Sequence, residues 1–317
     1  MNKKMHIIKD LLRKIRAGLS FPFNNKEKFY NAKDKIIIDK IYKIANKIKN
    51  KNQKKLNTHK IFSSKILNLI LKKKLLNFLQ FGFIQQMFFI HNRFFLILEL
   101  IQLYKDKNWV IWKKIIKEDN IGNPVKFFLY PYSSGNKIHQ AYHLKKFTQL
   151  SEIHLNKFTN VIEFGGGYGN MAKMFFKINK NISYTIFDTM EVNLLQYYYL
   201  KKSNLNVALG INKHSKINLL NKTSDLNKKL KLLKNNDKNL LIANWSLSEV
   251  PLKFRKELFF MFEKIDYQII SYQKKFEKID NQKYFEKINL YNNKKNRKSQ
   301  IINITNKPQN FYLFSYH

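Results

Sequence analysis

The chain has 317 residues, 44% of them hydrophobic and 15% aromatic, which is enough to bury the core of one large domain or two ordinary ones and excludes an intrinsically disordered protein. Its 60 lysines and arginines against 21 acidic residues give a formal charge of +39, the sign expected of a protein that binds nucleic acid or an anionic membrane. The absence of cysteine excludes disulfides, thiolate metal ligands and a cysteine nucleophile, and it is consistent with a reducing, cytoplasmic compartment.

The positive charge also has an explanation that involves no partner. Arginine, the preferred bidentate reader of phosphates and bases, occurs only at positions 13, 16, 93, 255 and 297, so nearly all of the charge is lysine. Lysine, asparagine, isoleucine, phenylalanine and tyrosine share AT-rich codons, and an AT-biased genome would give this composition whatever the function. The charge alone therefore does not establish a nucleic-acid partner.

Residues 1–122 predict a basic, helical N-terminal domain. Apolar residues recur there at helical spacing, and no alternating strand pattern interrupts them. The apolar stretch of residues 75–104 is broken by polar and charged residues and falls short of the roughly 20 apolar residues of a membrane span. Segments rich in Gly, Pro, Asn and Ser predict turns at residues 120–124 and 130–136, and we place the domain boundary between residues 122 and 123.

The first 20 residues are basic but contain no continuous apolar segment, so they do not predict a secretory signal. Residues 5–19 instead predict an amphipathic helix, whose apolar stripe runs from Ile8 to Leu19 opposite lysines and arginines. Such a helix either lies on an anionic membrane surface, which would make the protein peripheral at the inner membrane face, or packs against the helical domain. The sequence leaves both alternatives open.

Residues 123–317 change to alternating strands and helices, the pattern of an α/β domain with a parallel sheet. The expected strands are residues 160–164, 183–187, 240–245 and 267–272, and the expected helices are residues 171–178, 192–202 and 251–264. Two more strands, at residues 300–305 and 311–316, flank a turn and predict an antiparallel hairpin. A Rossmann-like sheet that ends in such a hairpin is more typical of methyltransferases than of dehydrogenases.

A glycine-rich loop follows the first of these strands, where glycine lets the backbone turn tightly and approach a ligand. The glycines are Gly165, Gly166, Gly167 and Gly169. The dinucleotide-binding fingerprint requires a glycine where Asn170 stands. An acidic residue, Glu163, two positions before a Gly-x-Gly-x-Gly run instead resembles the first motif of class I S-adenosylmethionine-dependent methyltransferases.

Two carboxylates accompany the loop, and each has a structural alternative. Asp188 ends the next strand, where a carboxylate can accept both ribose hydroxyls of an adenosine ligand, or it caps the following helix through Thr189. The resemblance implies that Glu163 engages the ammonium end of the methionine moiety, directly or through water. Its alternative is a structural hydrogen bond.

The segment Asn244 to Pro251 follows the fourth strand and borders the ligand crevice of a doubly wound sheet, so we expect Asn244 and Trp245 to contact the cofactor. Enzymes that methylate exocyclic amines of bases usually carry Asp/Asn-Pro-Pro-aromatic at this position, which this chain lacks. Ser246 and Glu249 predict a capping box for the next helix, and a catalytic role for Glu249 is the alternative.

Several segments together resemble a bacterial family of sugar O-methyltransferases. They are the stretches 142–144, 163–170, 184–188, 197–200, 244–251 and 308–314, within residues 121–317. The resemblance implies transfer of a methyl group from S-adenosylmethionine to a sugar hydroxyl of a glycan or sugar precursor. An RNA methyltransferase that uses the basic N-terminal region to bind RNA is the alternative.

Methyl transfer from a sulfonium to a hydroxyl needs a base for the hydroxyl proton. His139 and His143 are candidates because their i, i+4 spacing places both on one face of a helix before the glycine loop. Ordinary packing and hydrogen bonding is the alternative for both. No acidic residue lies on the same helix to complete a ligand set, so we expect no metal site.

Overall fold

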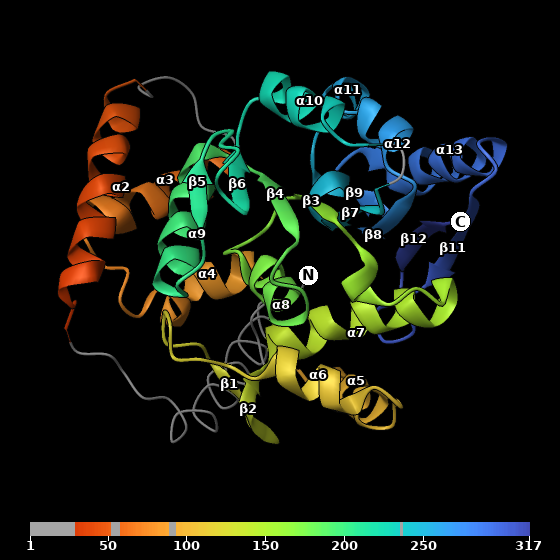
Figure 1. Cartoon of the computed structure of the whole chain (residues 1–317), viewed down its shortest axis with the longest axis horizontal. Helices are drawn as coiled ribbons and strands as arrows, with labels where there is room; N and C mark the ends of the chain where they lie inside the picture. Colours follow the sequence, from red (N-terminus) through yellow and green to blue (C-terminus); the bar gives the residue numbers. More distant parts are fainter. Residues whose placement is uncertain (1–28, 52–57, 89–92, 235–236) are drawn as a thin grey trace. The chain divides into compact units, whose positions relative to one another are not determined.

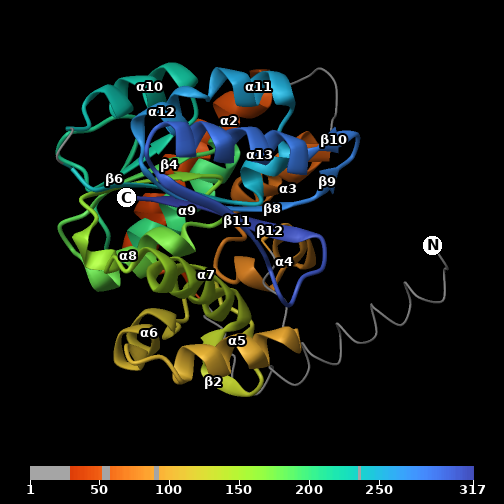
Figure 2. The same ribbon diagram turned by 90° about the vertical axis from the view of Figure 1, so that its right-hand side faces the viewer.

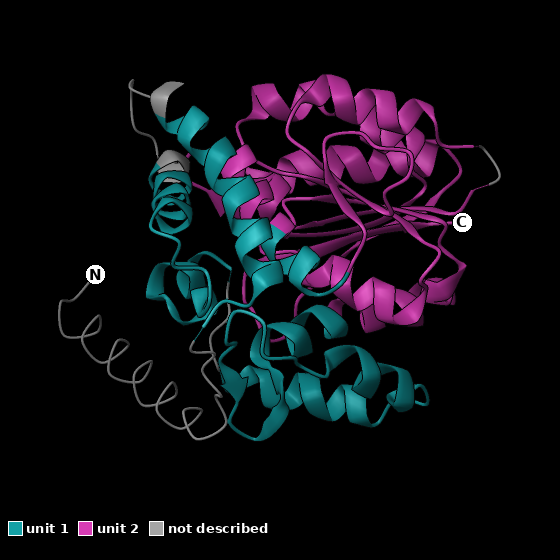
Figure 3. Cartoon of the chain, turned by 60° about the vertical axis from the view of Figure 1, so that its left-hand side comes forward, with its two compact units in different colours: residues 1–142, 198–204 teal, residues 143–197, 205–317 magenta. Residues whose placement is uncertain are grey.

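The computed structural model describes residues 29–51, 58–88, 93–234 and 237–317. The amphipathic helix predicted at residues 5–19 lies outside this part of the chain. The chain divides into two compact units (Figure 3): the first comprises residues 1–142 and 198–204, and the second residues 143–197 and 205–317. The domain boundary expected from the sequence, at residues 122 and 123, lies within the first unit.

The first unit is helical up to residue 116 in its described part, as the spacing of apolar residues predicts (Figure 1). Its helices are α2 (Ala32–Lys51), α3 (Thr58–Leu71), the 3-10 helix η2 (Phe78–Gln80), α4 (Gly82–Met87), α5 (Phe95–Tyr104) and α6 (Trp109–Ile116). Among the described helices, none combines the length and the hydropathy that a membrane crossing requires.

A short hairpin replaces the second predicted turn. Strand β2 (Tyr130–Ser134) pairs antiparallel with β1 (Lys126–Phe127), and helix α7 (Gly135–Ser151) begins directly after it. The prediction of a turn at residues 130–136 is therefore wrong for its first five residues. Tyrosine favours strands, and the hairpin partner supplies ladder hydrogen bonds that outweigh the turn preference of Pro, Ser and Gly.

Two lysine–carboxylate ion pairs are buried in the first unit. Lys137 Nζ lies 2.9 Å from Glu118 Oε1, and these side chains are 0% and 1% exposed. Lys202 Nζ lies 2.9 Å from Asp34 Oδ2, with side chains 10% and 2% exposed. Lys137 also donates to the carbonyl of Lys117, which helps to replace the water lost by its ammonium group.

The second unit is built on one eight-stranded sheet of order β11-β12-β8-β7-β3-β4-β6-β5. Its strands are β3 (Asn160–Phe164), β4 (Ser183–Phe187), β5 (Val207–Leu209), β6 (Ile217–Leu220), β7 (Asn239–Asn244), β8 (Tyr267–Gln273), β11 (Lys298–Asn303) and β12 (Asn310–Tyr316). The first six are parallel, and β12 pairs antiparallel with both β8 and β11. The fold is thus the expected α/β sheet with a C-terminal antiparallel hairpin.

Helices cover both faces of this sheet (Figure 2). One face carries α10 (Thr223–Lys231), α11 (Leu252–Glu257), α12 (Phe260–Lys264) and α13 (Asn281–Lys294), and the other carries α8 (Asn170–Ile178), most of α9 (Met190–Lys202) and the second half of α7. The helix predicted at residues 251–264 is two helices, because the chain turns at residues 258–259 between α11 and α12.

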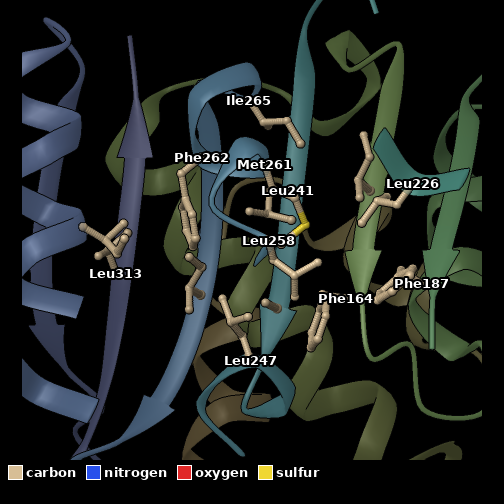
Figure 4. Close-up of a cluster of buried hydrophobic side chains, with 14 of the residues drawn as sticks. Phe164, Phe187, Leu226, Leu241, Leu247, Leu258, Met261, Phe262, Ile265 and Leu313 are labelled. Carbon is tan, nitrogen blue, oxygen red and sulfur yellow. The ribbon is translucent and has the colours of Figure 1, made fainter. Parts of the chain in front are cut away.

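The core beneath the first group of helices contains alternate residues of the strands, among them Phe164 of β3, Leu241 of β7 and Leu313 of β12 (Figure 4). Full burial of such side chains stabilises the fold by about 1.5–3 kcal/mol each relative to exposure. Because side chains alternate along a strand, the residue next to Phe164, Glu163, lies on the opposite face, the one that carries α8.

Candidate functional site

The candidate site lies at the carboxyl ends of three neighbouring strands of the second unit. The glycine loop follows β3, Asp188 follows β4, and Trp245 follows β7. The chain continues from β3 to β4 on one side, whereas β7 pairs on the other side of β3. This reversal of strand order makes a topological switch point, the place where open α/β sheets bind ligands.

The glycine loop turns through left-handed backbone conformations, with φ of +72° at Gly165 and +54° at Gly167. A Cβ on Gly165 would lie 2.2 Å from Cβ of Ser246, and a Cβ on Gly166 would lie 2.5 Å from Cγ2 of Ile186. Packing against the protein's own side chains therefore requires glycine at these two positions, whatever the loop binds.

Glu163 is buried on β3, where its Oε2 accepts a 2.8 Å hydrogen bond from the hydroxyl of Tyr184 on β4. The pKa of Glu163 is raised to about 8, mainly by burial and to a lesser extent by the nearby Asp188 carboxyl, while the hydrogen bond from Tyr184 opposes the rise. The structural hydrogen bond weighed for Glu163 therefore exists. It leaves the other carboxyl oxygen for a second interaction.

Asp188 accepts hydrogen bonds from three directions. The amide of Thr189 donates to Oδ1 over 2.8 Å, Nε2 of Gln196 donates to Oδ2 over 3.0 Å, and the amide of Gly166 also donates to the carboxylate. Burial raises the pKa of Asp188 to about 7, and these three donors oppose the shift. The local contact with Thr189 foreseen from the sequence is present, and the carboxylate is at the same time attached to the glycine loop.

Gln196 is a site residue that the sequence analysis missed. Its side-chain amide on α9 donates both to the carbonyl of Gly167, over 2.9 Å, and to Asp188. The side chain is completely buried, and its Oε1 has no hydrogen-bond partner among the described residues. A glutamine inside the otherwise apolar run 194–200 was the signal, because a buried polar side chain needs a specific partner.

The segment after β7 is hydrogen-bonded to the start of the glycine loop. The hydroxyl of Ser246 donates to the carbonyl of Phe164, the residue just before Gly165. Ser246 is thus inside the 3-10 helix η4 (Ser246–Glu249) and forms no capping hydrogen bond with it. The predicted capping box of Ser246 and Glu249 is therefore wrong, since the loop carbonyl takes the serine hydroxyl.

Trp245 and Asn244 are placed where the sequence analysis expected them, at the end of β7. Trp245 has a left-handed backbone with φ of 61°, and its indole Nε1 donates to Oδ1 of Asn310 over 2.8 Å. The Oδ1 of Asn244 accepts from the hydroxyl of Ser271 over 2.9 Å. The ammonium of Lys307 lies 4.1 Å from the centre of the Trp245 ring, a cation–π contact.

A buried arginine, which the sequence analysis did not select, holds the same segment. The guanidinium of Arg255 donates from Nε to the carbonyl of Val250 over 2.8 Å and from NH2 to that of Ser248 over 2.7 Å. It also stacks over the ring of Tyr284 at 4.9 Å. Rigid guanidinium geometry lets one side chain hold two carbonyls, so Arg255 fixes the path of the chain between Trp245 and α11.

The two candidate histidines share helix α7 but have different partners. His143 is fully buried, with Nδ1 2.5 Å from the hydroxyl of Tyr312 and its ring 5.4 Å from that of Trp245. His139 belongs to the first unit, where its Nδ1 lies 3.0 and 2.9 Å from the two carboxyl oxygens of Glu99. In the part of the chain that the structure describes, no three His, Asp or Glu side chains are grouped to hold a metal ion.

Comparison of the sequence with models of protein families and with curated proteins found no match. Among solved structures, the chain is similar to a mitomycin 7-O-methyltransferase at 7% identity and a TM-score of 0.35, over 58% of this chain and 57% of that one. The chain thus spans little more than half the length of that protein.

Two further structures are similar over most of their own length. They are a precorrin-6y C5,15-methyltransferase from Geobacter metallireducens (8% identity, TM-score 0.37, 56% of this chain and 85% of that one) and a magnesium protoporphyrin IX methyltransferase from Synechocystis with bound SAM (10%, 0.37, 69% and 97%). At these identities and TM-scores the likeness says nothing about what this chain does.

Proposed function

We propose that this chain is an S-adenosylmethionine-dependent methyltransferase that acts on a sugar hydroxyl. One observation carries the cofactor part of the proposal. Gln196 connects the carbonyl of Gly167 with the carboxylate of Asp188, so the glycine loop and the acidic residue after the next strand form one hydrogen-bonded unit at the switch point of the sheet.

The residues present fit an adenosine ligand with a charged amino-acid end. The loop between Gly165 and Gly169 would hold that end, and Asp188 would accept from a ribose hydroxyl, because a carboxylate has about four acceptor positions and three are in use. Two buried acceptors beside the loop, Oε1 of Gln196 and Oδ1 of Asn170, have no partner among the described residues. A ligand with several N–H and O–H donors would satisfy them.

Glu163 supplies a site for the ligand's positive charge. The pKa of Glu163 is raised to about 8 because its carboxyl is buried, and no positively charged group contributes to the shift. An ammonium group near it would favour the ionised form and lower that pKa. When bound, the cofactor supplies an activated methyl group, and the task of the protein is to align an acceptor oxygen with it and to remove a proton.

We propose His143 as the base for that proton. It is adjacent to Trp245 at the end of β7, and its Nδ1 is hydrogen-bonded to the Tyr312 hydroxyl, which fixes the orientation of the ring. The imidazole of His143 would take the proton from the acceptor hydroxyl. His139 is the less suitable of the two histidines, because its Nδ1 is held by the Glu99 carboxylate in the first unit. Glu249 is the alternative to His143 as the catalytic base.

The sugar acceptor rests on the sequence resemblance, above all on the run Trp245-Ser-Leu-Ser-Glu249. The RNA alternative rests on the positive charge alone, and an AT-biased genome would give the same lysine-rich composition without an RNA partner. The test is incubation of the full-length protein with methyl-labelled S-adenosylmethionine and either glycan extracts from its own organism or total RNA. Label in a glycan that the His143→Ala variant fails to transfer supports the proposal, and label only in RNA contradicts it.

A further inference from the structure

Helix α5 has an apolar outer face, although its inner face buries Leu96 and Leu103. Its only charged residue, Glu99, is completely buried against His139, whereas Leu98, Ile101 and Tyr104 are exposed. These three recur every third residue and therefore form one outward stripe. A helix on the surface of a globular protein normally presents polar residues to water, so the apolar outer face of α5 would gain free energy from an apolar surrounding.

The exposed apolar surface continues beyond α5. Helix α6 packs against both α5 and β2. The rings of Tyr104 and Trp109 are 5.4 Å apart, those of Trp109 and Tyr130 are 6.3 Å apart, and Tyr130 contacts Tyr132 at 5.6 Å. We call this the α5–α6 surface; its exposed residues are Leu98, Ile101, Tyr104, Val110, Leu129 and Tyr132. Figure 2 shows α5, α6 and β2 beside one another at the bottom of the view.

Lysines border the α5–α6 surface. Lys113 and Lys114 follow Val110 by three and four residues on α6, so they flank it on the helix surface, and Val110 itself is 80% exposed. Lys105 and Lys107 lie in the turn between α5 and α6. All four are exposed, and none forms an ion pair with a described residue. The surface thus combines aliphatic residues, interfacial aromatics and unneutralised positive charge.

We propose that the α5–α6 surface binds an anionic membrane. Exposed Leu, Ile and Val gain free energy from acyl chains, Tyr and Trp favour the boundary between headgroup and acyl region, and lysines attract anionic lipids. Single-stranded RNA or a glycan would be recognised by aromatic rings, but neither would benefit from aliphatic side chains such as Leu98 and Val110. This surface shares no residue with the proposed methyltransferase site, and the proposal does not depend on that function.

The experiment is co-sedimentation of the full-length protein with phosphatidylcholine vesicles that do or do not contain phosphatidylserine, at low salt. We expect binding only with phosphatidylserine. The double variant Leu98→Ser with Val110→Ser should weaken binding at least about tenfold through lost apolar burial. Lys113→Gln with Lys114→Gln should weaken it about thirtyfold through lost attraction to the lipid.

Matched control variants make the same kinds of substitution outside the α5–α6 surface. Leu232 and Leu290 of the second unit are each 61% exposed, and their double change to Ser should leave binding unaltered. So should Lys231→Gln with Lys287→Gln, which lowers the net charge by the same amount as the surface variant. Loss of binding in these controls that equals the loss in the surface variants would overturn the proposal.

Three other results would overturn it as well. If deletion of residues 1–20 alone abolishes binding while the Leu98 and Val110 variant binds normally, membrane contact belongs to the N-terminal segment. The surface variants could reduce affinity for an RNA oligomer while vesicle binding is absent. Sedimentation velocity could show a dimer that only the surface variants dissociate, again without vesicle binding, and the occupant would then be a second copy of the chain.

Discussion

The side-chain amide of Gln196 donates a 3.0 Å hydrogen bond to Oδ2 of Asp188, eight residues earlier in the chain. The same nitrogen donates to the carbonyl of Gly167, so one buried side chain sets the distance between the glycine loop and the carboxylate. The residues that would bind the two ends of an adenosine ligand are therefore held in place before any ligand arrives.

We expect Gln196→Leu, which keeps the volume and removes both hydrogen bonds, to weaken binding of S-adenosylhomocysteine about tenfold or more. Isothermal titration calorimetry measures this. Gln300→Leu is the control, because it removes a glutamine whose amide bonds to Tyr316 on the outer hairpin. Unchanged affinity in Gln196→Leu, with a lower melting temperature alone, would show that Gln196 serves the fold and not the ligand.

Asp188→Ala should weaken binding of the same ligand about ten- to a hundredfold, because a charged hydrogen-bond acceptor contributes about 1.5–3 kcal/mol. Equilibrium dialysis with labelled ligand gives the dissociation constant. The alternative role, support of the chain before α9 through the amide of Thr189, predicts a different result: a lower melting temperature with the dissociation constant unchanged.

Gly167→Val should abolish S-adenosylmethionine binding while the protein remains folded, since valine does not tolerate φ of +54° and its side chain would enter the loop. Gly210→Val is the matched control. Gly210 also has positive φ, +87°, and a Cβ there has no atom within 4 Å. Both variants carry backbone strain, so a loss of binding shared by both would be a general effect, and wild-type affinity in folded Gly167→Val would exclude the loop as the cofactor site.

Glu163 should make the ligand-free protein less stable as the pH rises. Its pKa is raised from 4.5 to about 8 in the folded state, so between these values the folded protein holds a proton that the unfolded chain releases. The free energy of unfolding then falls by about 1.4 kcal/mol per pH unit across this window from this group alone. Asp188, raised from 3.8 to about 7, acts in the same direction.

The Glu163→Gln variant isolates this contribution. It should melt at a temperature close to that of the wild type at pH 4, where Glu163 is protonated in both states, and well above it at pH 9, where the buried carboxylate destabilises the wild type. Thermal unfolding across this range is the measurement. If the melting temperatures of the two proteins differ by the same amount at every pH, the pKa of Glu163 is not raised.

Much of the second unit was predictable because its strands are local signals. Short runs rich in β-branched and aromatic residues gave β3 and β4 at the bounds that the structure has, and the hairpin at residues 298–316 differed by at most two residues at each strand end. The Gly-rich loop and Asp188 were found because each directly follows a strand. Their positions directly after a strand were enough to predict that they lie close together, because the carboxyl ends of parallel strands meet at one edge of the sheet.

The contacts between distant segments were not predictable in the same way. Gln196 and Arg255 lie on helices, and nothing in their local sequence indicates the carbonyls that they bind. Ser246 illustrates the same point: the spacing to Glu249 predicted a cap, but the carbonyl of Phe164, 82 residues earlier, takes its hydroxyl. Hydrogen bonds between residues so far apart in the chain depend on the order of the strands in the sheet. That order cannot be inferred from a short stretch of sequence.

The two buried ion pairs of the first unit, Lys137 with Glu118 and Lys202 with Asp34, bear on how this protein responds to ionic strength. Dissolved ions screen charges at the surface but hardly reach pairs from which water is excluded. Meanwhile a formal charge of +39 makes the compact chain repel itself, and salt relieves that repulsion. Salt should therefore weaken the repulsion of the whole chain more than it weakens these two buried attractions, and we expect the melting temperature to rise with ionic strength.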